Sequence, residues 1–307
     1  MDSRKLTIDL FLKHPGFPVA VVPVNLREPA EPDYTFVSHY HDFQELVVIT
    51  SGSGIQRING TDYPVSAGDV FLLQGKDEHC FVPAGNSLGL YNILYDQDNL
   101  PLPLGLFHKI GSYNMIFRVE PALRKNQNFI SHIHLDAPRL ADLNRHIKSL
   151  QAVLDGGEEG FEVESVTLLA SLILNLCRNC RANSAENGKT VLAERMNKVI
   201  SLMEKNFAHH YSVAELARSM HTSPRNFSRL FHKVTGSSPI EYLLKVRLRH
   251  AAELLISADI SCADAAWQSG FADSNYFSRK FSEQYGLSPR EYRKYNRESL
   301  KKQRFPL

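Results

Sequence analysis

The chain has 307 residues, enough for two domains that each bury a core, and a formal net charge of only +2. It shows no apolar run long enough to span a bilayer and no charged-then-apolar leader, so we expect no membrane contact. Its four cysteines, Cys80, Cys177, Cys180 and Cys262, do not make a disulfide framework, and we expect a cytoplasmic location.

The small net charge hides an uneven distribution. From residue 190 onward the sequence holds 19 Lys and Arg against 11 Asp and Glu, a net of +8, whereas residues 1–189 hold 16 against 22, a net of −6. An acidic front half and a basic back half indicate that only the back half faces a polyanion. A basic helical domain can also be merely soluble, so the charge alone does not establish nucleic-acid binding.

Residues 1–135 are predicted to form an all-β barrel. Within residues 19–95, apolar stretches alternate with glycine-containing turns, which we place at residues 51–54, 59–60 and 67–69. Strands that recur this often with tight turns favour an antiparallel sandwich or barrel. Residues 96–131 mix strand and loop signals with several prolines.

Two histidines and a glutamate stand at positions 39, 41 and 45 of this barrel. On one strand, their even spacing would place His39, His41 and Glu45 on the same face. His79, on a later strand, is a fourth candidate, and the pattern resembles the metal site of cupins, which are small β-barrels. Inward-facing imidazoles and a carboxylate could hold Fe, Mn, Ni or Zn. The alternative is a metal-free barrel whose polar interior binds a ligand directly.

Residues 136–182 are predicted to form two helices, interrupted at Gly156 and Gly157. Apolar residues recur at steps of three and four and give each helix one seam. The seams are Leu140, Leu143, Ile147, Leu150 and Leu154, followed by Val166, Leu169, Ile173 and Leu176. Either the two helices pack on each other and on the barrel, or they form the interface of a homodimer. The polar residues 183–191 lack periodicity and are predicted to be the interdomain linker.

The strongest pattern is an internal repeat in the back half. A shift of 50 residues aligns residues 227–242 with residues 277–292. Nine of the 16 positions are identical, and they include glycines, Ser-Pro pairs and aromatic residues. Such identity indicates a duplicated unit.

Each copy of the repeat carries the start and stop signals of a helix-turn-helix. The signals are capping boxes at Ser212-x-x-Glu215 and Ser261-x-x-Asp264, helix caps at Ser223 and Asp273, and glycine stops at Gly236 and Gly286. A short helix, a tight turn and a second helix make this motif, whose second helix enters the major groove of DNA. A long helix from residue 238 to about residue 256 joins the units and would fix the separation of their recognition helices.

The exposed positions of the two predicted recognition helices hold side chains suited to DNA. Arg pairs with guanine and Asn with adenine, while Ser and Lys reach phosphates. The candidates are Arg225, Asn226, Ser228, Arg229 and Lys233 in the first helix, and Ser274, Asn275, Ser278 and Arg279 in the second. A helical bundle without a nucleic-acid role, the alternative, does not explain these side chains.

From residue 192 to residue 296 the chain resembles the AraC/XylS class of bacterial transcription regulators. The segment GFADSNYFSRKFSEQYGLSPREYR, residues 270–293, is similar to the C-terminal signature of that family, and the linking helix carries the matching pattern Arg247-x-x-x-Ala251-x-x-Leu254-Leu255. The resemblance implies base contacts from Arg225, Ser228, Arg229, Asn275, Tyr276 and Arg279. The sequence departs from the family at Ala265, where a larger aliphatic residue is usual, and we expect Trp267 to fill the space.

The front half looks most like the sensor domains of L-rhamnose operon regulators, a resemblance carried by residues 39–79. It implies a sugar or similar polyol in the barrel. The implied hydroxyl partners are His39, His41, Glu45, Arg57 and His79. No cofactor is required for this function, and a divalent metal held by His39, His41, Glu45 and His79 remains a candidate.

We therefore expect two domains, an N-terminal all-β cupin-like barrel followed by helices and a C-terminal all-α double helix-turn-helix at residues 192–296, with residues 297–307 as a basic tail. The leading hypothesis is a non-enzymatic transcription regulator that binds double-stranded promoter DNA and a small-molecule effector. Activation of transcription, through RNA polymerase, is implied by the resemblance alone. A metal-dependent cupin enzyme and a ligand-independent DNA-binding protein are the alternatives.

Overall fold

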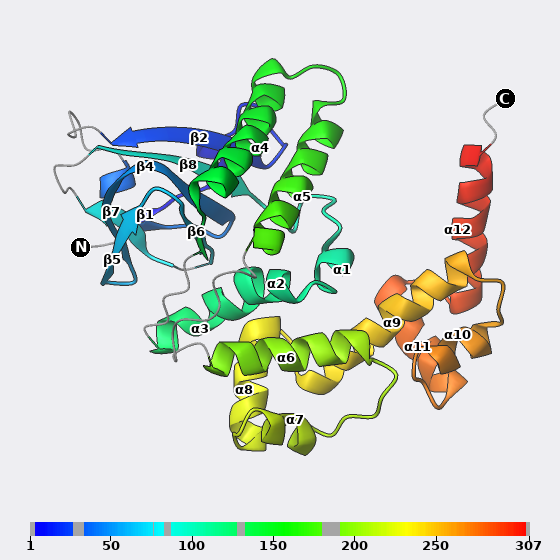
Figure 1. Cartoon of the computed structure of the whole chain (residues 1–307). Coiled ribbons are helices and arrows are strands. Elements are labelled where there is room, and N and C mark those ends of the chain that lie inside the picture. The colour runs from blue at the N-terminus through cyan, green and yellow to red at the C-terminus, as the bar shows by residue number, and fades with distance from the viewer. Residues whose placement is uncertain are drawn as a thin grey trace. The chain divides into compact units, whose positions relative to one another are not determined.

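The structure divides into two compact units, Met1–Ala193 and Glu194–Leu307, coloured from blue to red along the chain in Figure 1. This computed structural model describes residues 4–26, 34–75, 77–82, 87–127, 133–179 and 191–304. The predicted linker at residues 183–191 lies outside the described residues apart from Val191, where helix α6 begins. Within the described ranges no helix is long and apolar enough to cross a membrane.

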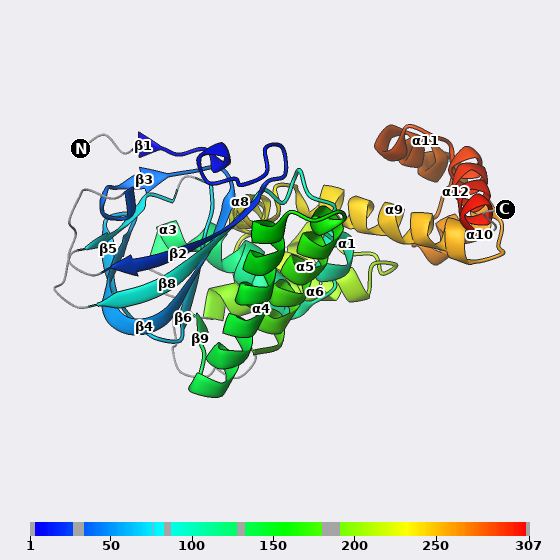
Figure 2. The same ribbon diagram turned by 90° about the horizontal axis from the view of Figure 1, so that it is seen from above.

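Two sheets that share one strand form the N-terminal part of the first unit, which confirms the predicted β-barrel. One sheet contains β2 (Val19–Leu26), β8 (Leu88–Tyr95), β6 (Asp69–Leu73), β9 (Ile133–His134) and the first half of β4 (Gln44–Ile58). The other contains β1 (Arg4–Lys5), β3 (His39–Tyr40), β7 (His79–Val82), β5 (Thr61–Ser66) and the second half of β4. Figure 2 shows both from above.

The predicted turn at residues 51–54 is wrong, because β4 continues through these residues and passes from one sheet to the other. Its pairing with β8 shifts register between Ile49 and Ser51. Gly52 has φ +76°, and a Cβ there would lie 1.8 Å from the carbonyl oxygen of Ser87, so only glycine fits this bend. The turn predicted at residues 59–60 is present, with positive φ at both residues, and it joins β4 to β5.

Strand alternation divides the apolar residues of the first unit between two cores. Val47 and Ile49 of β4 lie in the core between the sheets, whereas Leu46 and Val48 pack in a second core with the helices. Glu45 lies two residues before Val47 and therefore shares the inner face of the strand. A carboxylate thus enters the interior of the barrel, where it is 4% exposed.

Residues 96–127, which the sequence leaves between strand and loop, are largely helical. They contain α1 (Leu104–Phe107), α2 (Gly111–Asn114), a π-helical turn (Met115–Val119) and α3 (Glu120–Gln127). The rings of Phe107, Tyr113 and Phe117 stack in succession, with centroids 5.0 and 4.8 Å apart. Helices this short depend on such tertiary packing rather than on a periodic sequence.

Helices α4 (Ala137–Gly156) and α5 (Phe161–Asn179) lie side by side against the β2–β8–β4 sheet (Figures 1 and 2). Asp136 caps the start of α4, and Gly157, with φ +59°, ends it. Most residues of the predicted seams are buried with sheet residues in one core, and Leu140 and Val166 pack against it partly buried. The two helices therefore pack on each other and on the barrel, and a subunit interface would have to use their other faces.

The second unit is all-helical, as predicted. Its helices are α6 (Val191–Lys205), α7 (Val213–Ser219), α8 (Pro224–Thr235), α9 (Pro239–Ser257), α10 (Cys262–Gln268), α11 (Ser274–Tyr285) and α12 (Pro289–Arg304). The capping boxes of α7 and α10 are formed, and Gly236 and Gly286 end α8 and α11 in the left-handed conformation. The predicted basic tail begins inside α12, which is helical to Arg304.

The two helix-turn-helix units have phenylalanine cores, and Trp267 belongs to neither. Phe227, Phe231, Phe277 and Phe281 are at most 1% exposed. Trp267 is 74% exposed, so the expectation that it fills the space left by Ala265 is wrong. Ala265 is itself fully buried among the core residues of the second helix-turn-helix unit. A small residue there lets α10 approach the phenylalanines directly.

Candidate ligand site and nucleic-acid interface

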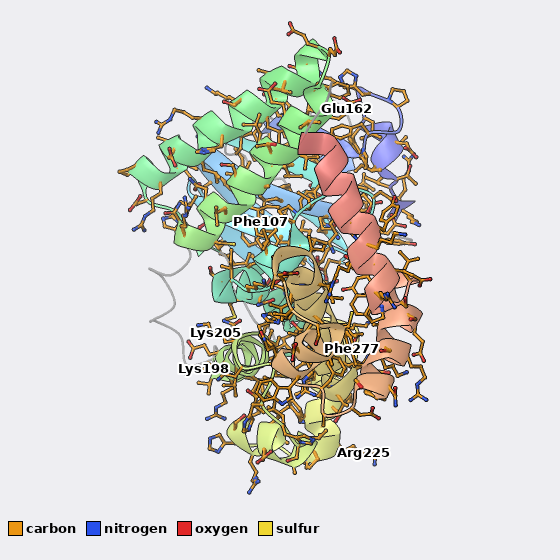
Figure 3. All side chains as sticks on the ribbon, turned by 90° about the vertical axis from the view of Figure 1, so that its right-hand side faces the viewer. Phe107, Glu162, Lys198, Lys205, Arg225 and Phe277 are labelled. Carbon is orange, nitrogen blue, oxygen red and sulfur yellow. The ribbon has the colours of Figure 1, made fainter. Side chains whose placement is uncertain are left out.

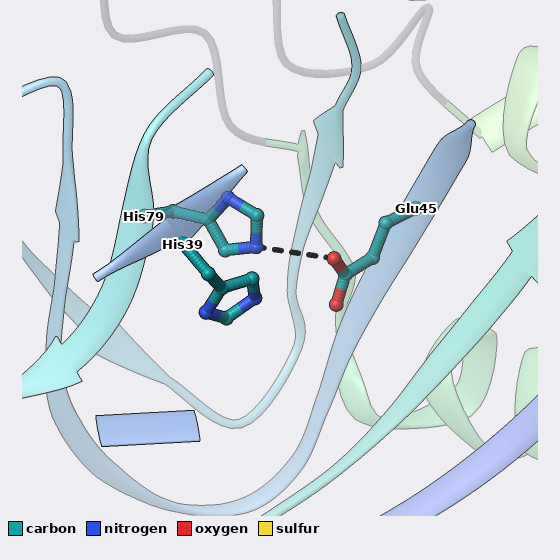
Figure 4. Close-up of side chains that lie close together, drawn as sticks. All are labelled: His39, Glu45 and His79. Atoms are coloured by element: carbon teal, nitrogen blue, oxygen red, sulfur yellow. Dashed lines mark hydrogen bonds and ion pairs between the residues drawn. The ribbon is translucent and has the colours of Figure 1, made fainter. Parts of the chain in front are cut away.

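Three strands bring the polar side chains of the barrel together. His39 on β3 pairs across to His79 on β7, and Glu45 comes from the start of β4. His79 Nε2 lies 3.1 Å from Glu45 Oε2 (Figure 4), and His41 Nε2 lies 2.8 Å from the same oxygen. All four residues are at most 5% exposed. One ligand atom from each of His39, Glu45 and His79 lies within 4.8 Å of the others.

The structure brings the predicted residues together, but the prediction that one strand carries His39, His41 and Glu45 is wrong. β3 ends at Tyr40 and β4 begins at Gln44, so the histidines and the glutamate are not on one strand. A bend between the two strands, rather than strand alternation, turns His41 toward Glu45. His41 also stacks on Phe43, with ring centroids 4.0 Å apart.

Backbone carbonyl groups fix the orientation of all three imidazole rings. The Nδ1 atoms of His39, His41 and His79 lie 2.8–2.9 Å from the carbonyl oxygens of Val37, Phe43 and Asp77. A carbonyl oxygen only accepts, so each Nδ1 carries a proton and donates it. Each Nε2 is therefore left to donate as an imidazolium or to offer a lone pair to a cation.

Burial and mutual contacts move the pKa values of this cluster in opposite directions. Burial, reinforced by the nearby His79, lowers the pKa of His39 to about 4. Burial would raise the pKa of Glu45, but hydrogen bonds from His41 and His79 outweigh it and hold the pKa below its usual range. For His79, burial lowers the pKa, but the hydrogen bond and charge of Glu45 outweigh burial and raise the pKa above its usual value. The cluster thus combines an anionic Glu45 with a neutral His39.

A cavity of about 10 Å³ adjoins the cluster. It is lined by Leu6, Phe11, His39, His41, Phe43, Glu45, Asn92 and Leu94. That volume holds about one water molecule or one ion, far less than the several hundred Å³ typical of small-molecule sites. Asn92 Oδ1 is buried and has no hydrogen-bond partner among the described residues. Two imidazoles and a carboxylate fit a small divalent transition metal, and Asn92 lines the same cavity.

The structure does not bring Arg57 into the cluster. Its side chain is half exposed and donates through Nη2 to Asp62 Oδ2 at 2.9 Å, across the hairpin of β4 and β5. Two buried amides, Asn92 on β8 and Gln56 on β4, were not predicted from the sequence. Both amide atoms of Gln56 lack a partner among the described residues. Neither amide belongs to a motif: Asn92 stands in an apolar strand, whereas Gln56 lies between Ile55 and Arg57.

The candidate DNA-binding residues lie on the surfaces of α8 and α11. Arg225, Arg229 and Lys233 are exposed, and Asn226 and Ser228 are half buried. All five candidates of α11, namely Ser274, Asn275, Tyr276, Ser278 and Arg279, are exposed. Figure 3 shows Arg225 at the outer side of α8, whereas Phe277 lies among the helices.

Equivalent positions of the two recognition helices orient an arginine in different ways. In α8, Arg229 Nη2 donates to Asn226 Oδ1 at 2.9 Å, and Asn226 Nδ2 donates to Thr222 Oγ1 at 2.8 Å. In α11, the guanidinium of Arg279 lies 5.6 Å from the ring centroid of Tyr276. Asn226 and Tyr276 are related by the 50-residue repeat, and so are the two arginines.

Comparisons with known proteins cover both units. Residues 24–173 match the model of an AraC-like ligand binding domain, and residues 216–295 match that of a helix-turn-helix domain. The HTH-type transcriptional activator RhaS of Escherichia fergusonii is 32% identical over 277 residues, which cover 90% of this chain and 94% of the relative. RhaS of Enterobacter sp. is 30% identical with the same coverage. The DNA-binding domain of AdpA, solved with a target DNA, is 30% identical over 34% of this chain and 95% of that one, at a TM-score of 0.34.

Proposed function

Because the chain belongs to the AraC family of transcription regulators, we propose that it activates transcription from promoter DNA in response to a sugar or similar polyol bound in its N-terminal barrel. A ligand-binding domain and a helix-turn-helix domain in one chain support this division of tasks. The buried polar cluster around Glu45, inside the matched ligand-binding domain, carries the proposal. The relatives are transcriptional activators, so the chain is a regulator and not a metal-dependent enzyme.

On the DNA side, Arg229 and Arg279 each contact a guanine, and Lys233 contacts a phosphate. A bidentate Arg–guanine pair contributes about 1–3 kcal/mol of discrimination, which is roughly a 5- to 150-fold change in affinity. We therefore expect Arg229→Ala and Arg279→Ala to relax the base preference at one position each, in titrations of the full chain with duplexes selected from a random pool. Lys233→Ala should weaken binding to all sequences alike. Unchanged affinity and preference in both arginine variants would refute the assignment.

On the ligand side, Glu45, the Nε2 atoms of the histidines and Asn92 supply the hydrogen-bonding groups for hydroxyls. The cavity is too small for a monosaccharide, so a bound sugar has to displace covering side chains such as Leu6 or Phe11. A sugar at 100 times its Kd should stabilise the protein by about 2.7 kcal/mol. The test is a thermal-shift screen of monosaccharides and their deoxy analogues with the wild type, Glu45→Gln and the surface control Asp62→Asn.

The expected result is stabilisation by one sugar class that Glu45→Gln abolishes and Asp62→Asn retains. Stabilisation by none of the sugars, together with promoter binding and transcription that ignore them all, would favour a ligand-independent DNA-binding protein. Stabilisation that Glu45→Gln leaves intact would place the ligand elsewhere.

A divalent transition metal is a second candidate for the barrel, because the donor set and the small cavity suit an ion better than a free sugar. His39, Glu45 and His79 would hold it, and His41 would orient Glu45. When bound, such an ion anchors vicinal hydroxyls as a Lewis acid. Metal analysis of the purified full chain tests this. Metal that is lost in His39→Ala and His79→Ala but retained in the matched control His134→Ala supports it, and a folded wild type without metal rejects it.

The homodimer also remains a proposal. Because the seams of α4 and α5 are buried within the subunit, an interface would use the exposed sides of these helices, where Val163 is 73% exposed. Light scattering of the wild type and Val163→Glu tests this. A monomeric wild type would reject the homodimer. Contact with RNA polymerase, implied by the resemblance, is part of the same proposal.

A further inference from the structure

A loop of the first helix-turn-helix unit touches the turn of the second. The loop, residues 207–211, lies between α6 and α7. The opposing turn, Ser269 and Gly270, lies directly after α10 in the connection to α11. Helix α9 lies between the two units in the chain and contributes Arg247 and His250. We call these groups together the loop–turn contact.

Arg247 is the centre of the loop–turn contact. Its Nε donates to the carbonyl oxygen of Phe207 at 2.8 Å, and its Nη2 donates to that of His209 at 3.0 Å. The ring of His250 lies 4.2 Å from that of Phe207, and its Nδ1 lies 3.4 Å from Ser269 Oγ. One face of α9 therefore holds the loop of one unit and the turn of the other.

Gly270 brings the two units into direct contact. It has φ +85°, and a Cβ at this position would lie 2.7 Å from Cα of Ala208 and 3.0 Å from Nε of Arg247. No side chain fits between turn and loop without moving backbone. Gly286 also has a positive φ, +70°, but a Cβ there meets nothing within 4 Å.

Helix α9 packs against α8 of the first helix-turn-helix unit and against α10 and α11 of the second. Beside the loop–turn contact lies a cavity of about 110 Å³, lined by residues of both units that include Tyr211, Ile240, Phe271 and Tyr276. The units are therefore not joined by continuous packing on this side. The loop–turn contact is a second connection in addition to α9, and two connections restrain rotation as well as distance.

We propose that Arg247 and Gly270 are positioning residues that hold the two recognition helices in one relative orientation. The DNA-binding unit then binds the two segments of its DNA site at one spacing only. This inference rests on the proposed function, in which both α8 and α11 bind DNA. One inserted base pair moves the second segment by about 3.4 Å and turns it by about a tenth of a helical repeat. A rigid reader senses both changes, whereas two loosely joined units tolerate them.

The test compares spacing preferences in the full chain. Operator duplexes are selected with the wild type from a random pool, and one or two base pairs are then inserted or removed between the two segments. Anisotropy titrations are made with the wild type, Gly270→Ala, Arg247→Met and the matched control Gly286→Ala, which also places alanine at a positive φ but without the collision. Arg247→Lys, which keeps the charge and one donor, serves as the milder variant if Arg247→Met does not fold.

We expect the wild type and Gly286→Ala to lose at least about tenfold in affinity on a one-base-pair change, equivalent to about 1.4 kcal/mol. Gly270→Ala and the Arg247 variants should lose less than about threefold. A purely structural role would weaken binding to every spacing equally and leave the preference intact, which would overturn the proposal, as would a wild type indifferent to spacing. Failure of the proposed function gives a different result from failure of this inference. If α8 and α11 do not bind DNA, Arg229→Ala and Arg279→Ala leave affinity unchanged at every spacing.

Discussion

Asn226 provides a sharp test of how the first recognition helix works. By residue type it is a candidate adenine reader, yet in the structure its amide accepts from Arg229 and donates to Thr222. Both polar groups of the amide are engaged within the protein. We therefore predict that Asn226 acts by orienting Arg229 rather than by contacting a base.

The magnitude follows from the side chain that is released. Immobilising a rotamer-rich side chain on binding costs about 0.5–1.5 kcal/mol, and an orienting partner reduces that cost beforehand. Asn226→Ala should therefore weaken binding about 2- to 13-fold, whereas Arg229→Ala, which also removes the base contact, should weaken it about 5- to 150-fold. Thr222→Val, which leaves Asn226 in place but unanchored, should give a smaller loss than Asn226→Ala.

The assay is a set of anisotropy titrations with the selected operator and duplexes that carry each single base-pair change. Asn226→Ala should reduce discrimination at the position that Arg229 senses and at no other. The double variant Asn226→Ala/Arg229→Ala should bind like Arg229→Ala alone. A separate base position at which only Asn226→Ala loses discrimination would refute the reasoning and make Asn226 a base reader.

Three further predictions concern stability. Glu204 is buried between Tyr242 and Arg249, so Glu204→Ala, which leaves a partly buried guanidinium without its carboxylate, should destabilise the second unit by about 2–4 kcal/mol in urea unfolding followed by circular dichroism. The pKa of His39 is lowered from 6.5 to about 4, so His39 should cost the metal-free protein up to about 3 kcal/mol of stability as pH falls from 6.5 to 4, measured as the difference in pH-dependent melting between the wild type and His39→Asn. Ser212→Ala removes the cap of α7 and should cost about 1 kcal/mol, measured by the same urea method.

The second unit was predictable because its determinants are local. Capping boxes, glycine stops and the repeat specify where each helix begins and ends, and the structure places α7, α8, α10 and α11 accordingly. The environment of Trp267 was not predictable, because whether a large side chain fills a space left by Ala265 depends on how closely α10 approaches its neighbours. That distance is a tertiary property.

The first unit was predictable in class but not in detail. The glycines of residues 51–54 have the composition of a hairpin, yet the bend at Gly52 exists because a distant segment at Ser87 approaches the backbone. The convergence of His39, Glu45 and His79 likewise depends on a bend and on strand pairing, neither of which spacing reveals. Asn92 and Gln56 carry no motif, and only their burial without partners identifies them.

The exposure of Trp267 has a practical consequence for studying signal transfer. It is the single tryptophan of the chain and lies on α10, far along the sequence from the barrel residues. Selectively excited indole emission therefore reports only on the second unit, while the buried Tyr95 and Tyr113 belong to the first. A ligand that fills the barrel without influencing the DNA-binding unit should leave the indole spectrum unchanged. The natural sequence thus carries a fluorophore that separates occupancy from response without any label.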